Sequence, residues 1–171
     1  MTQLVHGQAF ADFVLGYEHE AFRLEVRERY NEPEETEQLR RFLAGAPDYA
    51  WNEEWAAMMR QRTAAGQRMQ RVRIVTEPHS DYTRFGLDLA RINVAAGEDI
   101  RYLPRDRAKD LDLPDHDFWL IDSSKVGILR FGQDDVLRSA EIPTDPAVVV
   151  GHCHWRDVAW HHAVPYGEYV R

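Results

Sequence analysis

The segment Arg71-Val72-Arg73-Ile74-Val75 is a short run rich in β-branched residues, and it opens the part of the chain, residues 70–122, around which the rest is arranged. Such runs are typical of strands in a sheet. Two further extended runs follow at residues 100–103 and 118–121. A helical pattern separates the first two runs. The order strand, helix, strand, loop, strand predicts a βαβ core with a right-handed crossover.

The helix of this core is predicted from its apolar side chains, which recur every three or four positions and so share one face. They are Tyr82, Phe85, Leu89, Ile92 and Ala96. Pro78 suits the start of the helix and Gly97 suits the position just after its end. We expect the first four apolar residues to be buried against the sheet. The charged residues between them, Arg84, Asp88 and Arg91, should be exposed. We expect a salt bridge between Arg84 and Asp88, which are four positions apart.

The part of the chain before the core is predicted to be mostly helical, with helices over about residues 8–15, 33–44 and 52–65. Residues 22–27 instead alternate apolar and charged side chains, which predicts a strand with one buried and one solvated face. We expect this strand to join the central sheet, because an isolated strand leaves its backbone groups unpaired.

After the core the chain turns at Ser123-Ser124, and residues 126–131 are predicted to form the return strand of a β-hairpin. A second turn leads to a weaker predicted strand over about residues 136–142. Asp145 is suited to cap a final helix with Pro146 as its first residue. The sequence therefore predicts an α/β protein, with α+β as the alternative. We expect a single domain over residues 1–171, in which residues 1–66 are helical with one strand and residues 67–171 form the core and the C-terminal helix.

Composition excludes several classes of protein. The chain has 171 residues, is 44% hydrophobic and carries a net charge of −8, so it lacks the general attraction to phosphate that nucleic-acid binders need. No apolar run is long enough to span a membrane, and the N-terminus lacks a signal-peptide pattern. The single cysteine, Cys153, agrees with a reducing compartment. We expect a cytoplasmic protein that binds neither membrane nor nucleic acid.

Histidines near the C-terminus are the strongest chemical signal. On a helix, His154, Asp157 and His161 share one face and could bind a metal ion. The simpler interpretation is a solvated face on which Asp157 pairs with His161. The spacing of helical zinc motifs is absent between these histidines, and no nucleophile elbow, Walker loop or dinucleotide fingerprint occurs. The sequence thus predicts no cofactor, no metal and no catalytic residue.

A binding site is predicted at the carboxyl rim of the sheet, where ligands of open α/β sheets gather. Aromatic side chains would supply apolar area, an arginine would hold an anionic group, and a carboxylate would orient it. The alternative is that Arg101 and Asp117 form a structural ion pair without any cavity. The six residues expected to line the site, for a small ligand or a partner protein, are Tyr82, Arg84, Arg101, Asp117, Trp119 and Asp122.

Several motifs together resemble an actinobacterial family known only as a domain of unknown function, whose members are often encoded beside helix-turn-helix regulators. They include Phe22-Arg23-Leu24-Glu25, the run from Arg71 to Val75, Asp117-Phe118-Trp119-Leu120-Ile121-Asp122 and Arg156-Asp157-Val158-Ala159-Trp160. The resemblance implies a regulatory role with such a partner, and it does not include the histidine cluster.

A second resemblance is to phospholipase-D-like domains, which serve as effector modules in some regulators. It rests on Gly97-Glu98-Asp99-Ile100-Arg101 before one strand and on the run from Phe118 to Asp122. Active enzymes of that fold carry His-x-Lys-x-x-x-x-Asp, and no histidine here is followed two residues later by lysine. This implies a binding role without catalysis.

The function expected from the sequence is therefore a non-enzymatic regulatory or sensor module that binds a small ligand or a partner protein. One alternative is a toxin-like nuclease or hydrolase that uses His154, Asp157 and His161. Another is a homodimeric scaffold.

Overall fold

The computed structural model describes all 171 residues and builds them around one mixed sheet of eight strands. The strands are β1 (Thr2–Val5), β2 (Glu20–Glu25), β3 (Arg68–Val75), β4 (Asp99–Pro104), β5 (Phe118–Ile121), β6 (Lys125–Phe131), β7 (Leu137–Pro143) and β8 (Val164–Pro165). Their order across the sheet is β1-β7-β6-β5-β2-β3-β4-β8. The β2–β3 and β3–β4 pairings are parallel, and every other pairing is antiparallel.

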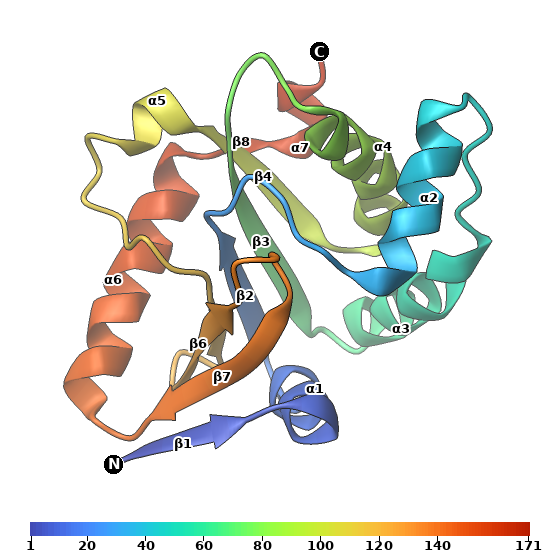
Figure 1. Ribbon diagram of the computed structural model, residues 1–171. Helices are drawn as coiled ribbons and strands as arrows, with labels where there is room; N and C mark the ends of the chain where they lie inside the picture. The colour runs from blue at the N-terminus through green and yellow to red at the C-terminus, as the bar shows by residue number, and fades with distance from the viewer.

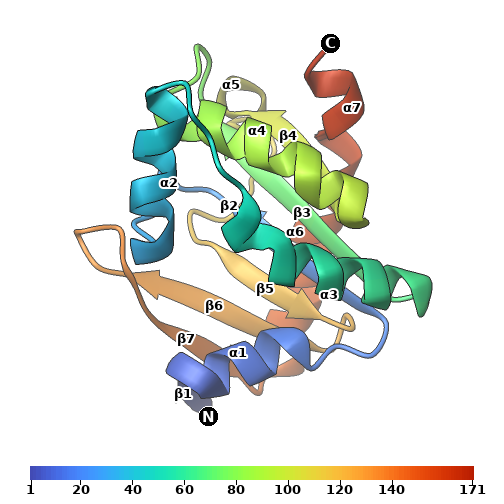
Figure 2. The same ribbon diagram turned by 90° about the vertical axis from the view of Figure 1, so that its right-hand side faces the viewer.

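Helices cover both faces of the sheet. They are α1 (Gly7–Leu15), α2 (Pro33–Leu43), α3 (Glu53–Ala64), α4 (Asp81–Ala96), α5 (Arg105–Ala108), α6 (Pro146–His162) and α7 (Tyr166–Tyr169), with a 3₁₀ turn η1 (Ala50–Asn52) before α3. Figure 1 shows α6 on one side of the sheet and α2, α3 and α4 on the other. Turned by 90°, α1 lies in front of the β6 and β7 end of the sheet (Figure 2). None of these helices is both long and apolar enough to cross a membrane.

The mixed α/β class is confirmed, and so is the β3–α4–β4 unit predicted from the sequence. Ser80 caps α4 by accepting a hydrogen bond from the Thr83 N–H at 3.1 Å. Gly97 ends it in the left-handed region, with φ of +116°. Pro78 is not part of the helix, since it follows a cis peptide bond two residues before the cap. Asp145 caps α6 as predicted, through the Ala147 N–H at 2.9 Å.

The periodic face of α4 is confirmed at its centre. Phe85 and Leu89 are buried, whereas Tyr82 and Ile92 are half-buried. The expected Arg84–Asp88 salt bridge is wrong, because Arg84 turns to Asp81, three residues earlier. Asp88 instead accepts a hydrogen bond from Tyr49, which anchors the loop before η1 to the helix.

Strand β2 joins the sheet as expected, and it does so at the centre, with β3 on one side and β5 on the other. Its alternating pattern does not produce a solvated face. Phe22 and Leu24 pack toward α6, while Arg23 and Glu25 point to the opposite face, where helices cover them. The prediction of one wet face was wrong because it assumed an uncovered sheet, and helices here lie on both faces.

The position of β5 also differs from a simple parallel extension of the core. It pairs antiparallel with β2 instead of lying beside β4. Asp117 therefore lies at the end of the sheet where β2 and β3 finish, and Asp122 lies at the opposite end. The sequence predicted both residues near one rim, but they flank the two ends of β5, so neither direction of this strand could bring them together.

Several short elements were not predicted. Strand β1 pairs with β7 and forms one edge of the sheet, so residues 1–66 contribute two strands and not one. Strand β8 pairs with β4 at the other edge of the sheet. The short helix α5 directly follows β4, and the short helix α7 directly follows β8. Short elements of this kind depend on tertiary contacts and carry little local pattern.

Candidate functional site

A cleft of about 400 Å³ lies between the sheet and the helices on its α4 side. We call it the arginine cleft, because its floor consists of Arg23 from β2, Arg71 and Arg73 from β3, and Trp119 from β5. Its walls come from α1, η1, α3 and α4, and the first turn of α2 adds Glu35. The chief wall residues are Phe10, Trp51, Trp55, Leu89 and Asn93. Ligand sites in proteins typically have this form, an apolar cleft with a few polar groups.

The floor follows directly from strand register. Arg23 lies opposite Arg71 in the β2–β3 pairing and opposite Trp119 in the β2–β5 pairing. Glu25, two residues further on, lies opposite Arg73. Because alternate side chains of a strand share a face, all five side chains reach the same side of the sheet. The guanidinium carbons of Arg23 and Arg71 lie 5.5 and 5.8 Å from the Trp119 ring centre, within range of a cation–π interaction.

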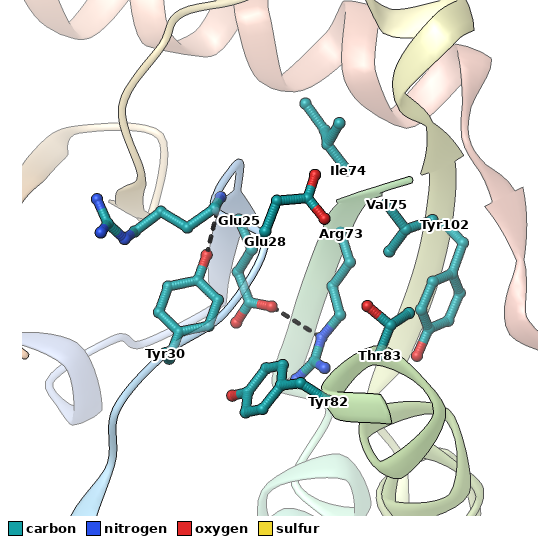
Figure 3. A pocket seen from close by; sticks show the side chains of 10 residues that line it. Glu25, Glu28, Tyr30, Arg73, Ile74, Val75, Tyr82, Thr83 and Tyr102 are labelled. Carbon is teal, nitrogen blue, oxygen red and sulfur yellow. Dashed lines mark hydrogen bonds and ion pairs between the residues drawn. The ribbon is translucent and has the colours of Figure 1, made fainter. Parts of the chain in front are cut away.

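Glu25 is the anion that holds the three floor arginines together. Its carboxylate lies 2.5 Å from Arg71 Nη1, 2.8 Å from Arg73 Nε and 3.3 Å from Arg23 Nε. Figure 3 shows Glu25 and Arg73 directed toward each other between the strands and α4. Burial alone would raise the pKa of Glu25, but the charges of Arg73, Arg71 and Arg23 lower it to about 2. The side chain is therefore a carboxylate at neutral pH.

Asp117 makes a second buried anchor at the edge of the arginine cleft. It accepts hydrogen bonds from the Tyr30 hydroxyl at 2.6 Å and the Val26 N–H at 2.9 Å, and lies 3.5 Å from Arg23 Nη2. Burial raises the pKa of Asp117 although Arg23 and these hydrogen bonds oppose the change. Burial also raises the pKa of the Tyr30 hydroxyl, so that Tyr30 remains a donor.

Glu35, on the first turn of α2, faces the arginine cleft from above the sheet. It accepts a hydrogen bond of 2.9 Å from the Tyr82 hydroxyl, which ties α2 to the start of α4. Burial raises the pKa of Glu35. Two further pairs of polar side chains connect the walls: Trp55 donates to Glu98 at 2.6 Å, and Asn52 donates to Asn93 at 2.7 Å.

Five buried N–H donors of residues lining the arginine cleft make no hydrogen bond within the protein. They are Arg23 Nε, Arg71 Nε, Arg73 Nε, Trp51 Nε1 and Trp119 Nε1. Arg73 Nε and Arg23 Nε lie 2.8 and 3.3 Å from the Glu25 carboxylate without forming a well-aligned hydrogen bond to it. Buried polar groups are nearly always hydrogen-bonded, and each unsatisfied one costs about 1–3 kcal/mol. A bound molecule or water that brings oxygen acceptors would satisfy these donors. The arrangement is therefore chemically suited to bind an acceptor-bearing ligand.

A separate small pocket lies at the carboxyl rim of the sheet, the position where the sequence predicted a ligand. Tyr30, Arg73, Tyr82 and Tyr102 line it together with the end of β2 (Figure 3). Its volume is about 20 Å³, room for about one water molecule. Arg73 lines both cavities, but only the arginine cleft is large enough for an organic ligand.

The six residues predicted to form one site are placed in different regions. Trp119 lines the arginine cleft, Asp117 pairs with Arg23 at its edge, and Tyr82 contacts it through Glu35. Arg84 is exposed on α4. Asp117 and Asp122 are separated because they flank the two ends of β5.

Two of the six have structural roles elsewhere. Arg101 points to the α6 side, with its guanidinium 3.7 Å from the Trp160 ring centre and Nη1 3.3 Å from the Trp160 carbonyl. Asp122 caps the turn before β2, accepting hydrogen bonds of 2.8 to 2.9 Å from three successive N–H groups. The alternative Arg101–Asp117 ion pair does not form, since Arg101 approaches Asp99 at 3.6 Å.

The C-terminal histidines do not form a metal centre. His154 and His161 are exposed on α6, Asp157 pairs with Arg156, and no group of three or more potential ligands is close enough together anywhere in the chain. The structure instead pairs His152 with His116, whose Nε2 atoms lie 3.1 Å apart.

Sequence reasoning missed most of the arginine cleft. The alternating pattern of residues 22–27 predicts a solvated face for Arg23 and Glu25, and no role beyond their strand is predicted for Arg71 and Arg73. The usable signal was that charged residues alternate on two neighbouring strands in the middle of a chain with helices on either side. Charges on such central strands must be buried, and buried charges require partners.

Comparison with solved structures defines the fold as phospholipase-D-like. A phospholipase D family member, Nuc from Salmonella typhimurium, matches with a TM-score of 0.53 and 12% identity over 97% of this chain and 96% of Nuc. NucT from Helicobacter pylori matches with a TM-score of 0.54 and 10% identity over 96% of this chain and 98% of NucT. Identities this low show the fold alone. Comparison with curated proteins gives no match.

Comparison of the sequence with family models identifies the family to which the chain belongs. Residues 8–171 match the model of the family described as Domain of unknown function (DUF6879), and the chain belongs to this family. Both resemblances expected from the sequence are thereby confirmed.

Proposed function

We propose that this chain is a non-catalytic regulatory or sensor module that binds a small molecule in the arginine cleft. The observation that carries the proposal is the set of five N–H donors without a hydrogen bond on the residues that line it. Three arginines and two tryptophans each keep one buried N–H group that forms no hydrogen bond within the chain, although Glu25 balances the charge of the arginines. A ligand with oxygen acceptors would satisfy them, and its affinity would draw on the donors already held in place.

The composition of the arginine cleft supports binding more than catalysis. No histidine, cysteine, serine or lysine lines it, so the usual nucleophiles and the usual general base are missing from its walls. Glu25 is engaged by three arginines and has no free role in proton transfer. The sequence also lacks the His-x-Lys-x-x-x-x-Asp motif of active enzymes of this fold.

The regulatory part of the proposal is supported by the resemblance to family members encoded beside helix-turn-helix regulators. In this view the ligand state of the cleft is read by a partner protein of that kind. The acidic charge of −8 agrees with action through a partner and not through direct contact with DNA. Co-purification of a helix-turn-helix regulator with the tagged chain from its host would support this part, and capture of no such regulator would contradict it.

The ligand-binding part is tested by native mass spectrometry of the protein purified gently from its host. We expect a small-molecule adduct on the wild type and on the surface variant Arg84→Ala. We expect the adduct to be reduced in Trp51→Phe and in Trp119→Phe, which keep an aromatic ring and remove only one N–H donor. Absence of an adduct, together with no heat of binding for small aromatic acids in calorimetry, would refute the proposal.

The nuclease or hydrolase alternative would use His154, Asp157 and His161. Nothing in the structure favours it, because these side chains are exposed and do not converge on a common point. No observation favours a homodimeric scaffold.

A further inference from the structure

We infer that the ligand of the arginine cleft is a planar aromatic or heteroaromatic compound that presents carboxylate or carbonyl oxygens and carries at most one negative charge. This inference rests on the proposed function and specifies its ligand. Three observations carry it: the balance of donors and acceptors, the balance of charge, and the nature of the walls.

The unpartnered groups favour a ligand rich in acceptors. Among the buried side-chain atoms of the floor and of the two wall tryptophans, the ones without a partner are all N–H donors. The one buried acceptor near them without a hydrogen bond is Glu98 Oε2, which lies 3.7 Å from Arg71 Nε. A ligand that offers mainly donors, such as an amine, would leave the N–H groups unsatisfied.

The charges set an upper limit on the charge of the ligand. Three buried carboxyl groups face the three floor arginines: Glu25 contacts all of them, Asp117 approaches Arg23, and Glu98 approaches Arg71. Glu35 adds a further acidic group from α2. The guanidinium charges are therefore compensated within the protein. A dianionic phosphate would be repelled by these carboxylates, whereas one carboxylate or a neutral carbonyl can accept hydrogen bonds without excess charge.

The walls favour a flat apolar body. Four aromatic side chains from four different elements surround the space: Phe10, Trp51, Trp55 and Trp119. Indole and phenyl faces pack best against another ring, and such pairs add about 0.5–1.5 kcal/mol beyond burial of area. Leu89 and Val14 complete an apolar enclosure. A volume of about 400 Å³ is sufficient for a compound of two fused rings with a short polar substituent.

The test compares three probes that share one naphthalene ring and differ in their polar group, measured by isothermal titration calorimetry. Naphthalene-2-carboxylate carries one negative charge, 2-naphthyl phosphate carries about two, and 2-naphthylmethylammonium carries one positive charge and no acceptor. We expect the carboxylate to bind about tenfold or more tightly than either of the others.

Variants then connect the affinity to the named donors. Trp119→Phe should weaken the carboxylate by roughly two- to tenfold, the effect of one lost hydrogen bond, and should leave the ammonium unchanged. Trp51→Phe serves the same purpose if Trp119→Phe fails to fold by circular dichroism. Glu35→Gln removes one acidic group but keeps an acceptor for Tyr82, and it should narrow the gap between phosphate and carboxylate.

The outcomes separate the two proposals. Tightest binding of the phosphate or of the ammonium would overturn this inference and leave the proposed ligand-binding function standing. Binding of none of the three would count against both. Carboxylate binding that survives unchanged in both tryptophan variants would also overturn the inference, because the donors would then not be the groups that recognise it.

Discussion

Glu25 lies directly opposite Arg73 in the parallel pairing of β2 and β3, and the two side chains meet at 2.8 Å between the sheet and α4. The contact is almost completely buried, with Glu25 only 4% exposed. One strand therefore brings the anion that the neighbouring strand needs. The same carboxylate also contacts Arg23 and Arg71, so Glu25 is the anion that all three floor arginines share.

Glu25→Gln should destabilise the protein strongly. The substitution keeps the shape of the side chain but leaves buried guanidinium groups without their anion, a change that typically costs about 3–5 kcal/mol. Urea unfolding followed by circular dichroism measures the loss. Glu37→Gln is the matched control, because Glu37 pairs only with Arg40 on the surface and should matter little. A loss in Glu25→Gln no larger than in the control would contradict the central role of this carboxylate.

Leu89→Ala should reduce the free energy of unfolding by roughly 2–5 kcal/mol, as a large-to-small change in a packed position. Leu89 is 6% exposed and lines the arginine cleft from α4. Leu43→Ala, at a residue 50% exposed at the end of α2, is the control and should have a small effect. Equal effects of the two substitutions in thermal unfolding would count against the packing of α4.

Gly97→Ala should destabilise the junction between α3 and α4 by about 1–3 kcal/mol. Its φ of +116° disfavours any side chain, and an added Cβ would lie 2.1 Å from Thr63 Oγ1. Gly151→Ala, in the middle of α6 with open space around it, should stabilise the helix by roughly 0.5–1 kcal/mol. Melting temperatures that move in the same direction for both variants would refute this assignment.

Stability should fall in mild acid because of the pair His116 and His152. Burial lowers the pKa of both imidazoles below 6.5, so the folded protein keeps them neutral where the unfolded chain takes up protons. The contribution of the two neutral imidazoles to the free energy of unfolding is complete above about pH 6.5. As the pH falls below that value, the free energy of unfolding decreases by up to about 1.4 kcal/mol per pH unit for each histidine.

The measurement compares the free energy of unfolding at about pH 7.5 and about pH 5.5. His152→Phe places a phenyl ring among Phe118 and Trp155, which already contact the imidazole edge-on, and should show a smaller acid loss than the wild type. His154→Ala, at an exposed position of the same helix, should retain the wild-type loss. An unchanged acid loss in His152→Phe would show that other groups cause it.

The isolated chain should not bind DNA nonspecifically at physiological salt, because its net charge is −8 and its central arginines are compensated by carboxylates. Fluorescence anisotropy with a labelled random duplex tests this. Micromolar binding that weakens steeply with added salt would overturn the prediction.

Local patterns were sufficient for the long elements and insufficient for the site. The period of α4, the capping residue Asp145, and the apolar run of β5 each depend on neighbours in the sequence, so the sequence alone predicts them. The direction of β5 relative to β2 depends on a pairing between residues far apart, for which one sequence carries no signal. That unknown placed Asp122 on the wrong rim. Arg23 was predicted on a solvated face for a different reason, because one sequence does not reveal that helices cover both faces of the sheet.

Strand β2 has consequences for the order in which the chain folds. Within β2, Arg23 pairs with Arg71 of β3 on one side and with Trp119 of β5 on the other. Both partner strands are synthesised well after β2. On the ribosome, the apolar residues Phe22 and Leu24 would thus emerge long before either flanking strand can cover them. Closing such distant pairings is slow. The sheet cannot become continuous until β5 has left the exit tunnel, so the central strand is among the first made and among the last to be fully enclosed.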